Sequence, residues 1–264
     1  MSHLSALDLS LLALGACLVG LSKTALPGAG TLSVGLFAAV LPARQSTGAL
    51  LVLLILGDLF AVWTYHAHAD WAALRRLVPA VLGGVLVGTL FLATAGDGTV
   101  RRVIGAILLA LIAVTLVQRA GTARRRNRSR PALDTVERTD PAAAHGSRRL
   151  ASTAYGVLAG FTTMVANAGG PVVSMYFLSA RFSVTRFLGT AAWFFFAVNV
   201  AKTPFSVSLG LIDLASLRLD LLLAPAVVVG AFAGRRLARR IDQKLFDRLV
   251  IVLTVVSAGY LLIA

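Results

Sequence analysis

The sequence is poor in charge and in cysteine. Only 14% of its 264 residues are Asp, Glu, Lys or Arg, and the mean hydropathy is +0.84. A soluble core of this size needs a larger polar shell, so the composition excludes an ordinary soluble domain. The one cysteine, Cys17, excludes an intrachain disulfide and a cysteine-rich metal site. We expect Cys17 to be a packing residue in the first helix.

Motifs of several other classes are also missing. The first eight residues carry no basic side chain, so no removable signal peptide is expected. The segment GAGTLSVG matches neither a phosphate loop nor a dinucleotide fingerprint, which leaves no ATPase or cofactor motif. The four histidines lie at termini or in loops, and the HAHAD segment at 66–70 is expected to be surface-exposed rather than metal-binding. The sequence therefore predicts no metal, no cofactor and no catalytic residues.

What the chain has is apolar runs along its whole length. Several approach the roughly 20 residues that span a bilayer, and others are shorter, as in broken or re-entrant segments. The sequence predicts an all-α polytopic membrane protein. The runs are 7–21, 31–41, 48–65, 77–95, 103–117, 150–166, 172–180, 187–205, 219–234 and 245–264.

The net charge of +14 is distributed unevenly along the chain. Lys23 and Lys202 lie within apolar segments. If residues 118–149 are cytoplasmic, 19 of the other 23 Lys and Arg face the cytoplasm, which predicts an outside N-terminus. The run ARRRNRSR at 123–130 is then interpreted as a topology determinant that contacts anionic lipid headgroups, and not as a nucleic-acid site. The four basic residues left outside are Arg44, Arg101, Arg102 and Arg218.

The polar stretch 118–149 divides the chain into two apolar halves. We predict a first membrane repeat at 1–117, a basic cytoplasmic linker at 118–149 and a second membrane repeat at 150–264. The halves match faintly: at an offset of 141, Gly28 meets Gly169 and Asp58 meets Asn199, and at an offset of 146, Gly84 meets Gly230. Each half reads as about five segments, so the two repeats have inverted topology, as in many secondary transporters. Chance matching of apolar sequence is the alternative.

The first two segments of each half are short and flank a Gly-rich break. The breaks are GLSKTALPGAGT at 20–31 and GFTTMVANAGGP at 160–171. Irregular backbone at membrane depth is tolerated where it lines a wet cavity, and a helix that starts there directs free N–H groups into it. Lys23 would add a full positive charge to such an anion site. The alternative is a surface turn with Lys23 snorkelling to headgroups. Further side-chain donors are Ser22, Thr24, Thr31, Thr162, Thr163 and Asn167.

Two more ionisable residues lie inside apolar segments. Asp58 is about ten residues into its run, and Lys202 is three residues beyond Asn199, on nearly the same helix face. A charge at this depth is costly and usually serves a function. One interpretation is a structural Asp58–Lys202 pair that ties the halves together. The other makes Lys202 an anion contact and Asp58 a proton-coupling or gating group.

These motifs resemble the sulfite exporter TauE/SafE family of membrane permeases. The resemblance covers nearly the whole chain, and its most specific parts are residues 20–51 and 167–205. It implies transport of sulfur-containing anions across the bacterial inner membrane. It carries over Lys23, Pro27, Gly28, Gly30, Asn167, Gly169, Gly170, Pro171, Asn199 and Lys202 as functional positions.

The leading hypothesis is a secondary transporter, an exporter of sulfite or organosulfonates that works by alternating access. Its partners are a small anionic substrate and anionic headgroups, with no nucleic acid, and a homo-oligomer is left open. Proton coupling at Asp58 is part of this hypothesis. An anion channel and, with less support, a membrane-embedded enzyme are the alternatives. The candidate substrate-binding residues are Ser22, Lys23, Thr24, Gly28, Gly30, Asn167, Gly169, Gly170, Asn199 and Lys202.

Overall fold

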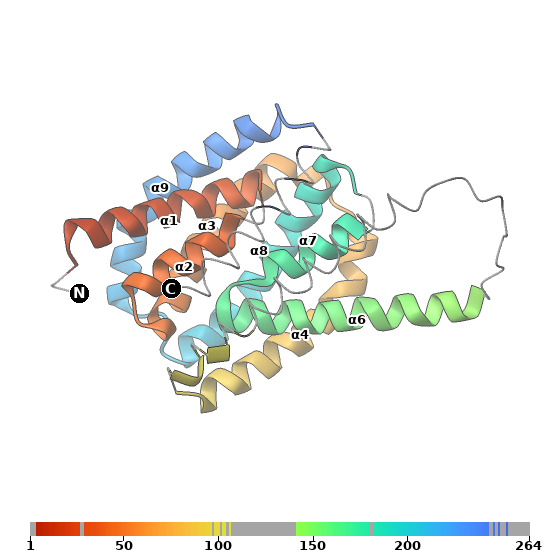
Figure 1. Ribbon diagram of the computed structural model, residues 1–264, viewed down its shortest axis with the longest axis horizontal. Helices are drawn as coiled ribbons and strands as arrows, with labels where there is room; N and C mark the ends of the chain where they lie inside the picture. Colours follow the sequence, from red (N-terminus) through yellow and green to blue (C-terminus); the bar gives the residue numbers. More distant parts are fainter. Residues whose placement is uncertain are drawn as a thin grey trace.

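The protein is helical throughout the part that the structure describes (Figure 1). The computed structural model describes residues 4–26, 29–96, 98–100, 102–103, 106, 141–179, 182–242, 245, 248 and 252. All the regular elements in these residues are helices, which confirms the all-α prediction. The helices are α1 (Ala6–Thr24), α2 (Gly30–Val40), α3 (Ala43–Tyr65), the 3₁₀ turn η2 (His66–His68), α4 (Trp71–Thr94), α6 (Pro141–Ala166), α7 (Gly169–Ser179), α8 (Val184–Ser208) and α9 (Leu214–Ala238).

Five helices are long and apolar enough to cross a membrane: Ala6–Thr24, Arg44–His68, Trp71–Thr94, Val184–Ser208 and Leu214–Ala238. The chain is therefore a multi-pass membrane protein. The expected fifth segment of each half, at 103–117 and 245–264, lies almost wholly outside the described residues, as does most of the linker. Residues 141–149, which were expected in that linker, form the start of α6.

Polar side chains fix where the long helices begin. The Ser5 side chain accepts the Asp8 N–H at the start of α1, and the Asp8 carboxylate accepts the Ser5 N–H in return. Asp213 and Ser216 make the same reciprocal pair at the start of α9. These caps satisfy N–H groups that have no partner within the helix.

The chain reverses direction at each Gly-rich segment. In the first half, Gly30 lies against Ser22 and Gly15 lies against Phe37, so α1 and α2 form an antiparallel hairpin. In the second half Gly169 lies against Thr163, and α7 returns along α6. The sequence predicted two short segments around each reversal. The structure gives 11 residues to both α2 and α7. The first helix of each half is longer than predicted, with 19 residues in α1, which is long enough to span, and 26 residues in α6.

Two parallel helix pairs join the halves through glycines. A Cβ at Gly20 of α1 would collide with the Val227 carbonyl of α9, and a Cβ at Gly230 would collide with the Cys17 carbonyl. Gly84 of α4 meets the Val157 carbonyl of α6 in the same way. Close backbone approach of this kind requires residues without a side chain.

Helices α3 and α8 cross at the centre in opposite directions. Gly48 near the start of α3 packs on Leu211, just after α8, and Gly189 near the start of α8 packs on Tyr65, at the end of α3. Asp58 and Asn199 meet at the middle of the crossing.

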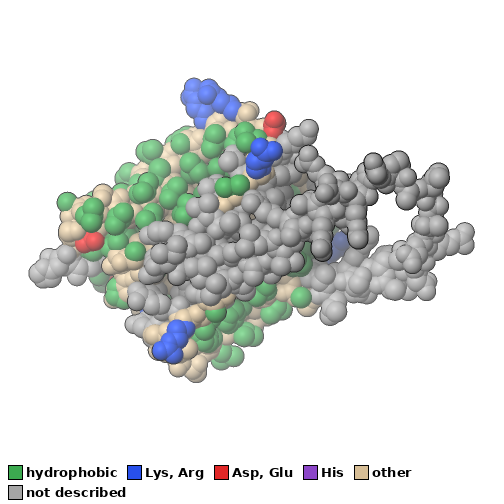
Figure 2. Space-filling view, in the orientation of Figure 1, with side chains coloured by type: hydrophobic (Ala, Val, Ile, Leu, Met, Phe, Trp, Pro, Cys, Tyr) green, Lys and Arg blue, Asp and Glu red, His purple; other side chains and the backbone are tan. Residues whose placement is uncertain are grey.

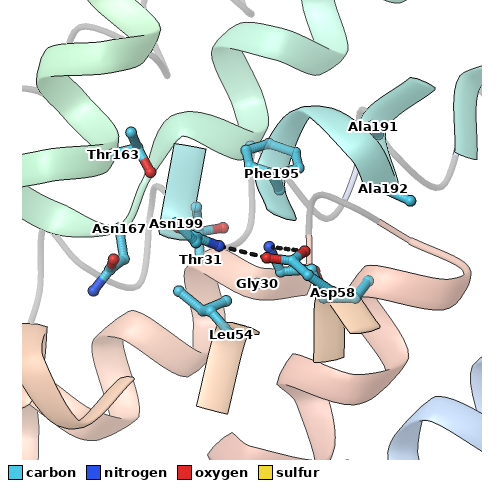
Figure 3. A pocket seen from close by; sticks show the side chains of 13 residues that line it. Gly30, Thr31, Leu54, Asp58, Thr163, Asn167, Ala191, Ala192, Phe195 and Asn199 are labelled. Carbon is cyan, nitrogen blue, oxygen red and sulfur yellow. Dashed lines mark hydrogen bonds and ion pairs between the residues drawn. The ribbon is translucent and has the colours of Figure 1, made fainter. Parts of the chain in front are cut away.

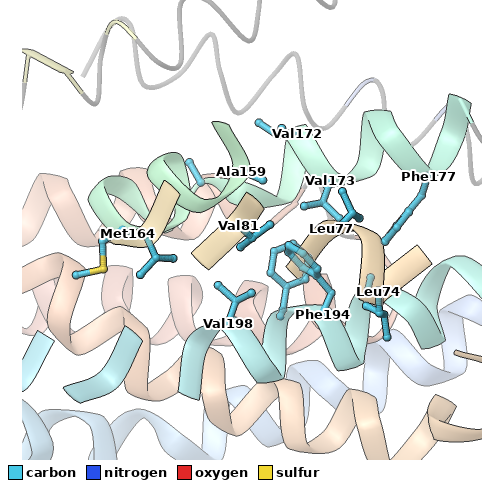
Figure 4. Close-up of a cluster of buried hydrophobic side chains, with 14 of the residues drawn as sticks. Leu74, Leu77, Val81, Ala159, Met164, Val172, Val173, Phe177, Phe194 and Val198 are labelled. Atoms are coloured by element: carbon cyan, nitrogen blue, oxygen red, sulfur yellow. The ribbon is translucent and has the colours of Figure 1, made fainter. Parts of the chain in front are cut away.

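Two apolar clusters hold these helices together. The larger joins α4, α6, α7 and α8, with Leu77, Phe177 and Phe194 among its buried members (Figure 4). The second joins α1, α2, α3 and α9 around Leu12, Phe37 and Leu223. Apolar side chains also cover much of the visible outer surface of the described part, with Lys and Arg confined to small groups (Figure 2). An apolar exterior of this kind suits a lipid environment.

Candidate functional site

A cavity lies where the two hairpins meet the α3–α8 crossing. We call it the central cavity (Figure 3). The space open to the centres of water-sized molecules is about 30 Å³. Its lining combines one ion pair, several hydroxyl and amide groups and a few apolar side chains. The lining residues are Ser22, Lys23, Gly30, Thr31, Leu54, Asp58, Thr163, Asn167, Gly170, Ala191, Ala192, Phe195 and Asn199.

Lys23 is buried in the cavity wall. Its Nζ lies 2.8 Å from Oδ1 of Asp58, and its side chain is only 8% exposed. The same Nζ lies 4.3 Å from the centre of the Phe195 ring, within the range of a cation–π contact. Lys23 thus points inward to a carboxylate. The snorkelling alternative required an outward-pointing, exposed Lys23, and the buried side chain does not fit it.

Asp58 joins the two halves of the chain. Its Oδ1 faces Lys23 of the first half, and its Oδ2 accepts a hydrogen bond from Nδ2 of Asn199 in the second half (Figure 3). The predicted structural pair between Asp58 and Lys202 is wrong. Asp58 forms its ion pair with Lys23 instead, because the end of α1 lies beside α3, where Gly57 packs against the Lys23 side chain.

Lys202 is held by neutral oxygens instead. Its Nζ donates to the Thr163 carbonyl at 2.8 Å and to Oδ1 of Asn167 at 2.6 Å, with a longer contact to the Thr163 hydroxyl at 3.3 Å. No carboxylate in the described part of the chain forms an ion pair with it. Lys202 is 1% exposed and does not itself line the cavity, but Thr163 and Asn167 do.

Asn167 connects three elements at the second reversal. Its backbone φ is +51°, in the left-handed region that Asn adopts more readily than most residues. Its side chain accepts from Lys202 of α8 and donates to the Thr47 carbonyl of α3, at 2.9 Å. The residue therefore shapes the reversal and also ties it to the α3–α8 crossing.

Comparison with known proteins identifies the chain at this point. The family model described as "Sulfite exporter TauE/SafE" matches residues 12–261, nearly the whole length. The chain belongs to the sulfite exporter TauE/SafE family. Searches among curated proteins and among solved structures gave no match. Family membership confirms the resemblance drawn from the sequence and makes the protein a membrane transporter of the sulfite exporter type.

The other candidate residues of this TauE/SafE family member fall into two groups. Ser22, Gly30 and Gly170 line the cavity, together with Thr31. Thr24 and Gly169 do not line it: the Thr24 hydroxyl donates to the Ala231 carbonyl of α9, and Gly169 packs on Thr163. Gly28, like Pro27, lies outside the described residues.

Sequence reasoning missed the apolar wall of the site. Phe195, Ala191 and Ala192 of α8 lie on the face that also presents Asn199, at helical spacing. Leu54 of α3 lies one turn before Asp58 and is missed in the same way. Reading one helical turn back from each polar candidate would have found Leu54 and Phe195.

The three ionisable groups of the site do not balance. Lys23 and Lys202 carry two positive charges and Asp58 one negative charge, which leaves +1 when all are ionised (two minus one). A net positive charge inside the membrane is stabilised by a bound anion. Within the described residues, no group of three or more His, Cys, Asp or Glu could hold a metal ion.

Proposed function

We propose that this TauE/SafE family member is a secondary transporter that exports sulfite or a related small sulfur-containing anion by alternating access. The observation that carries the proposal is the central cavity, which is lined by hydrogen-bond donors and by the Lys23–Asp58 pair, with Lys202 bound directly behind its lining residues Thr163 and Asn167. Together these three ionisable groups carry a net charge of +1 when all are ionised. The anion would be bound by Lys23, by the hydroxyls of Ser22 and Thr31, and by N–H groups at the start of α2, where no side chain caps the helix. Lys202 would act through Asn167 and Thr163.

An inverted repeat is supported by how the helices pair. The first helix of one half packs in parallel on the fourth helix of the other, giving the equivalent pairs α1–α9 and α4–α6. The third helices, α3 and α8, cross each other in opposite directions. Two hairpins on opposite sides of a central site are a common basis for alternating access, in which one half moves against the other.

The orientation in the membrane is proposed from the two ends of the helix bundle. Arg235 lies over the Trp63 ring, so the end of α9 is beside the end of α3 and the start of α4. That end holds Arg75, Arg76 and the arginines from 235 to 240, whereas Arg44 and Arg218 lie at the opposite end. We assign the arginine-rich end to the cytoplasm and the N-terminus to the outside, in a bacterial inner membrane.

The size of the cavity favours a small anion in this conformation. A sphere of 30 Å³ has a radius of about 1.9 Å, enough for one compact group of a few oxygens around a central atom. Sulfite meets that limit. An organosulfonate has a carbon chain as well, and we propose that it requires a wider cavity than the one observed.

Asp58 links substrate charge to protons in this proposal. With Asp58 ionised the site has a charge of +1, which matches hydrogensulfite. Protonation of Asp58 would release Lys23 from its ion pair and raise the charge to +2, which matches the sulfite dianion. Binding of the dianion would therefore favour uptake of a proton at Asp58, and movement of both together would be proton-coupled transport.

The test is flux of radiolabelled sulfite into liposomes that contain the purified protein. We expect saturable uptake that excess sulfite competes away, and we expect Lys202→Ala to abolish it while the protein keeps its fold. Arg218→Ala is the matched control, because Arg218 is exposed and its loss changes the net charge equally. Transport that survives Lys202→Ala would remove this lysine from the mechanism.

A further inference from the structure

Asp220 lies in the protein interior, away from the central cavity. It is 3% exposed and shares one face of α9 with the buried residues Ser216, Leu223 and Val227. Leu221, directly after it, is 77% exposed on the opposite side. Because the buried face is packed on α1 and α3, Asp220 cannot turn outward without movement of the whole helix.

The Asp220 carboxyl has no partner among the residues that the structure describes. None of them donates a hydrogen bond to either of its oxygens, and none forms an ion pair with it. Its helix neighbours Leu219 and Leu223 belong to the apolar cluster of α1, α2, α3 and α9. A carboxyl group buried among apolar side chains avoids the cost of a bare charge by holding a proton.

Charged groups on the elements around Asp220 are engaged elsewhere. On α1, Asp8 is bound to Ser5, and Lys23 is paired with Asp58 of α3. The other charged group of α3, Arg44, donates to the carbonyls of Leu92 and Ala95.

The remaining elements offer no counter-charge. Helix α2 contains no charged residue. On the first turns of α9 itself, Asp213 is bound to Ser216, and Arg218 is exposed to the outside of the bundle. Within the described part of the molecule, therefore, no positive charge offsets an ionised Asp220, and a bound proton would remove the charge.

We propose that Asp220 is a proton-binding site, separate from the central cavity, that is occupied while α9 is packed on α1 and α3. No residue of α9 lines the cavity. Asp220 is seven residues from the capped start of α9 at Asp213, roughly 10 Å along the helix axis. A modest separation of α9 from α1 and α3 would hydrate the carboxyl and release the proton toward that end of the bundle.

The use of this proton rests on the proposed transport function. If the α1–α9 contact opens during alternating access, Asp220 gives up and regains a proton once in each cycle, in addition to any proton at Asp58. Occupancy of the site does not depend on transport. The two ideas can therefore fail separately.

Infrared difference spectroscopy of the purified full-length protein tests occupancy. At neutral pH the wild-type protein should show the C=O stretch of a protonated buried carboxyl group, and Asp220→Asn should lose that band. Asp213→Asn, which changes an exposed aspartate on the same helix, should keep it. Persistence of the full band in Asp220→Asn, or its absence from the wild type, would overturn the proposal.

Thermal unfolding at several pH values is the second readout. As the pH rises from acid to neutral, the unfolding midpoint of the wild type should fall relative to Asp220→Asn and to Asp220→Leu, because only the wild type must keep a proton on a carboxyl group. An unchanged difference across this range would contradict the proposal. A protein that shows the band but no sulfite flux would keep the proton site and lose the proposed transport function. Sulfite flux without the infrared band would keep the proposed transport function and rule out the proton site.

Discussion

Breaking the Lys23–Asp58 ion pair is the sharpest perturbation that the site allows. Asp58→Asn preserves the shape of the side chain and an oxygen that can accept from Asn199, and it removes only the charge opposite Lys23. Removing one partner of a buried pair costs about 3–5 kcal/mol, because the other charge is left uncompensated. At roughly 2–4 °C per kcal/mol for a chain of this size, the thermal midpoint should fall by roughly 6–20 °C.

The double variant Lys23→Met/Asp58→Asn separates this cause from general damage. With no charge left unpaired, it should be more stable than Asp58→Asn alone, because replacing both members of a buried pair is much less costly than removing one. The midpoint is measured on detergent-purified protein. As a control, Arg186→Gln at the partly exposed Arg186–Asp70 pair should cost no more than about 1 kcal/mol. If the double variant is as unstable as the sum of its single variants, the ion pair does not hold the site together.

Three further changes are predicted. Gly84→Ala should destabilise the protein by about 1–3 kcal/mol, since the added methyl meets the Val157 carbonyl. Gly83→Ala, where no atom of the described residues lies within 4 Å of the added methyl, should be neutral or better in the same thermal assay. Asn167→Ala should lower both sulfite uptake and stability, because it places Ala at a positive φ and leaves Lys202 short of an acceptor. Asn167→Gly should recover only the stability lost to backbone strain. Equal stability of the two variants would show that φ is irrelevant. Burial raises the pKa of Asp70, but the Ala73 N–H and the Arg186 guanidinium outweigh it and hold that pKa below its ordinary value. The stability that Asp70 contributes should therefore be complete above about pH 4 and be lost as the pH falls further, and acid unfolding of Asp70→Asn should lack this component.

The sequence was sufficient to predict the class of fold, and several of its candidate residues line the central cavity. Apolar runs of about 20 residues are long enough to cross lipid as helices, and glycines between the runs indicated the reversals beside Lys23 and Asn167. The faint match of Asp58 with Asn199 selected the two residues that meet at the crossing of α3 and α8.

The pairing of charges was not predictable in the same way. The sequence suggested Lys202 as a partner for Asp58, and it suggested Lys23 only as an anion contact or a snorkelling side chain. Only the packing of the end of α1 on the middle of α3, against Gly57, gives the carboxylate to Lys23. The isolation of Asp220 was missed for a similar reason, since its burial depends on how α9 packs on α1 and α3.

The most direct test of the central claim is exchange of sulfite across liposome membranes. Liposomes that contain the protein are loaded with unlabelled sulfite. Their uptake of labelled sulfite is compared with uptake into protein-containing liposomes that were loaded without sulfite. A carrier with one central anion site returns faster when it is occupied, so internal sulfite should accelerate uptake in the wild type and have no effect in Lys202→Ala. Uptake that is indifferent to internal sulfite would contradict a carrier and favour an open anion pore.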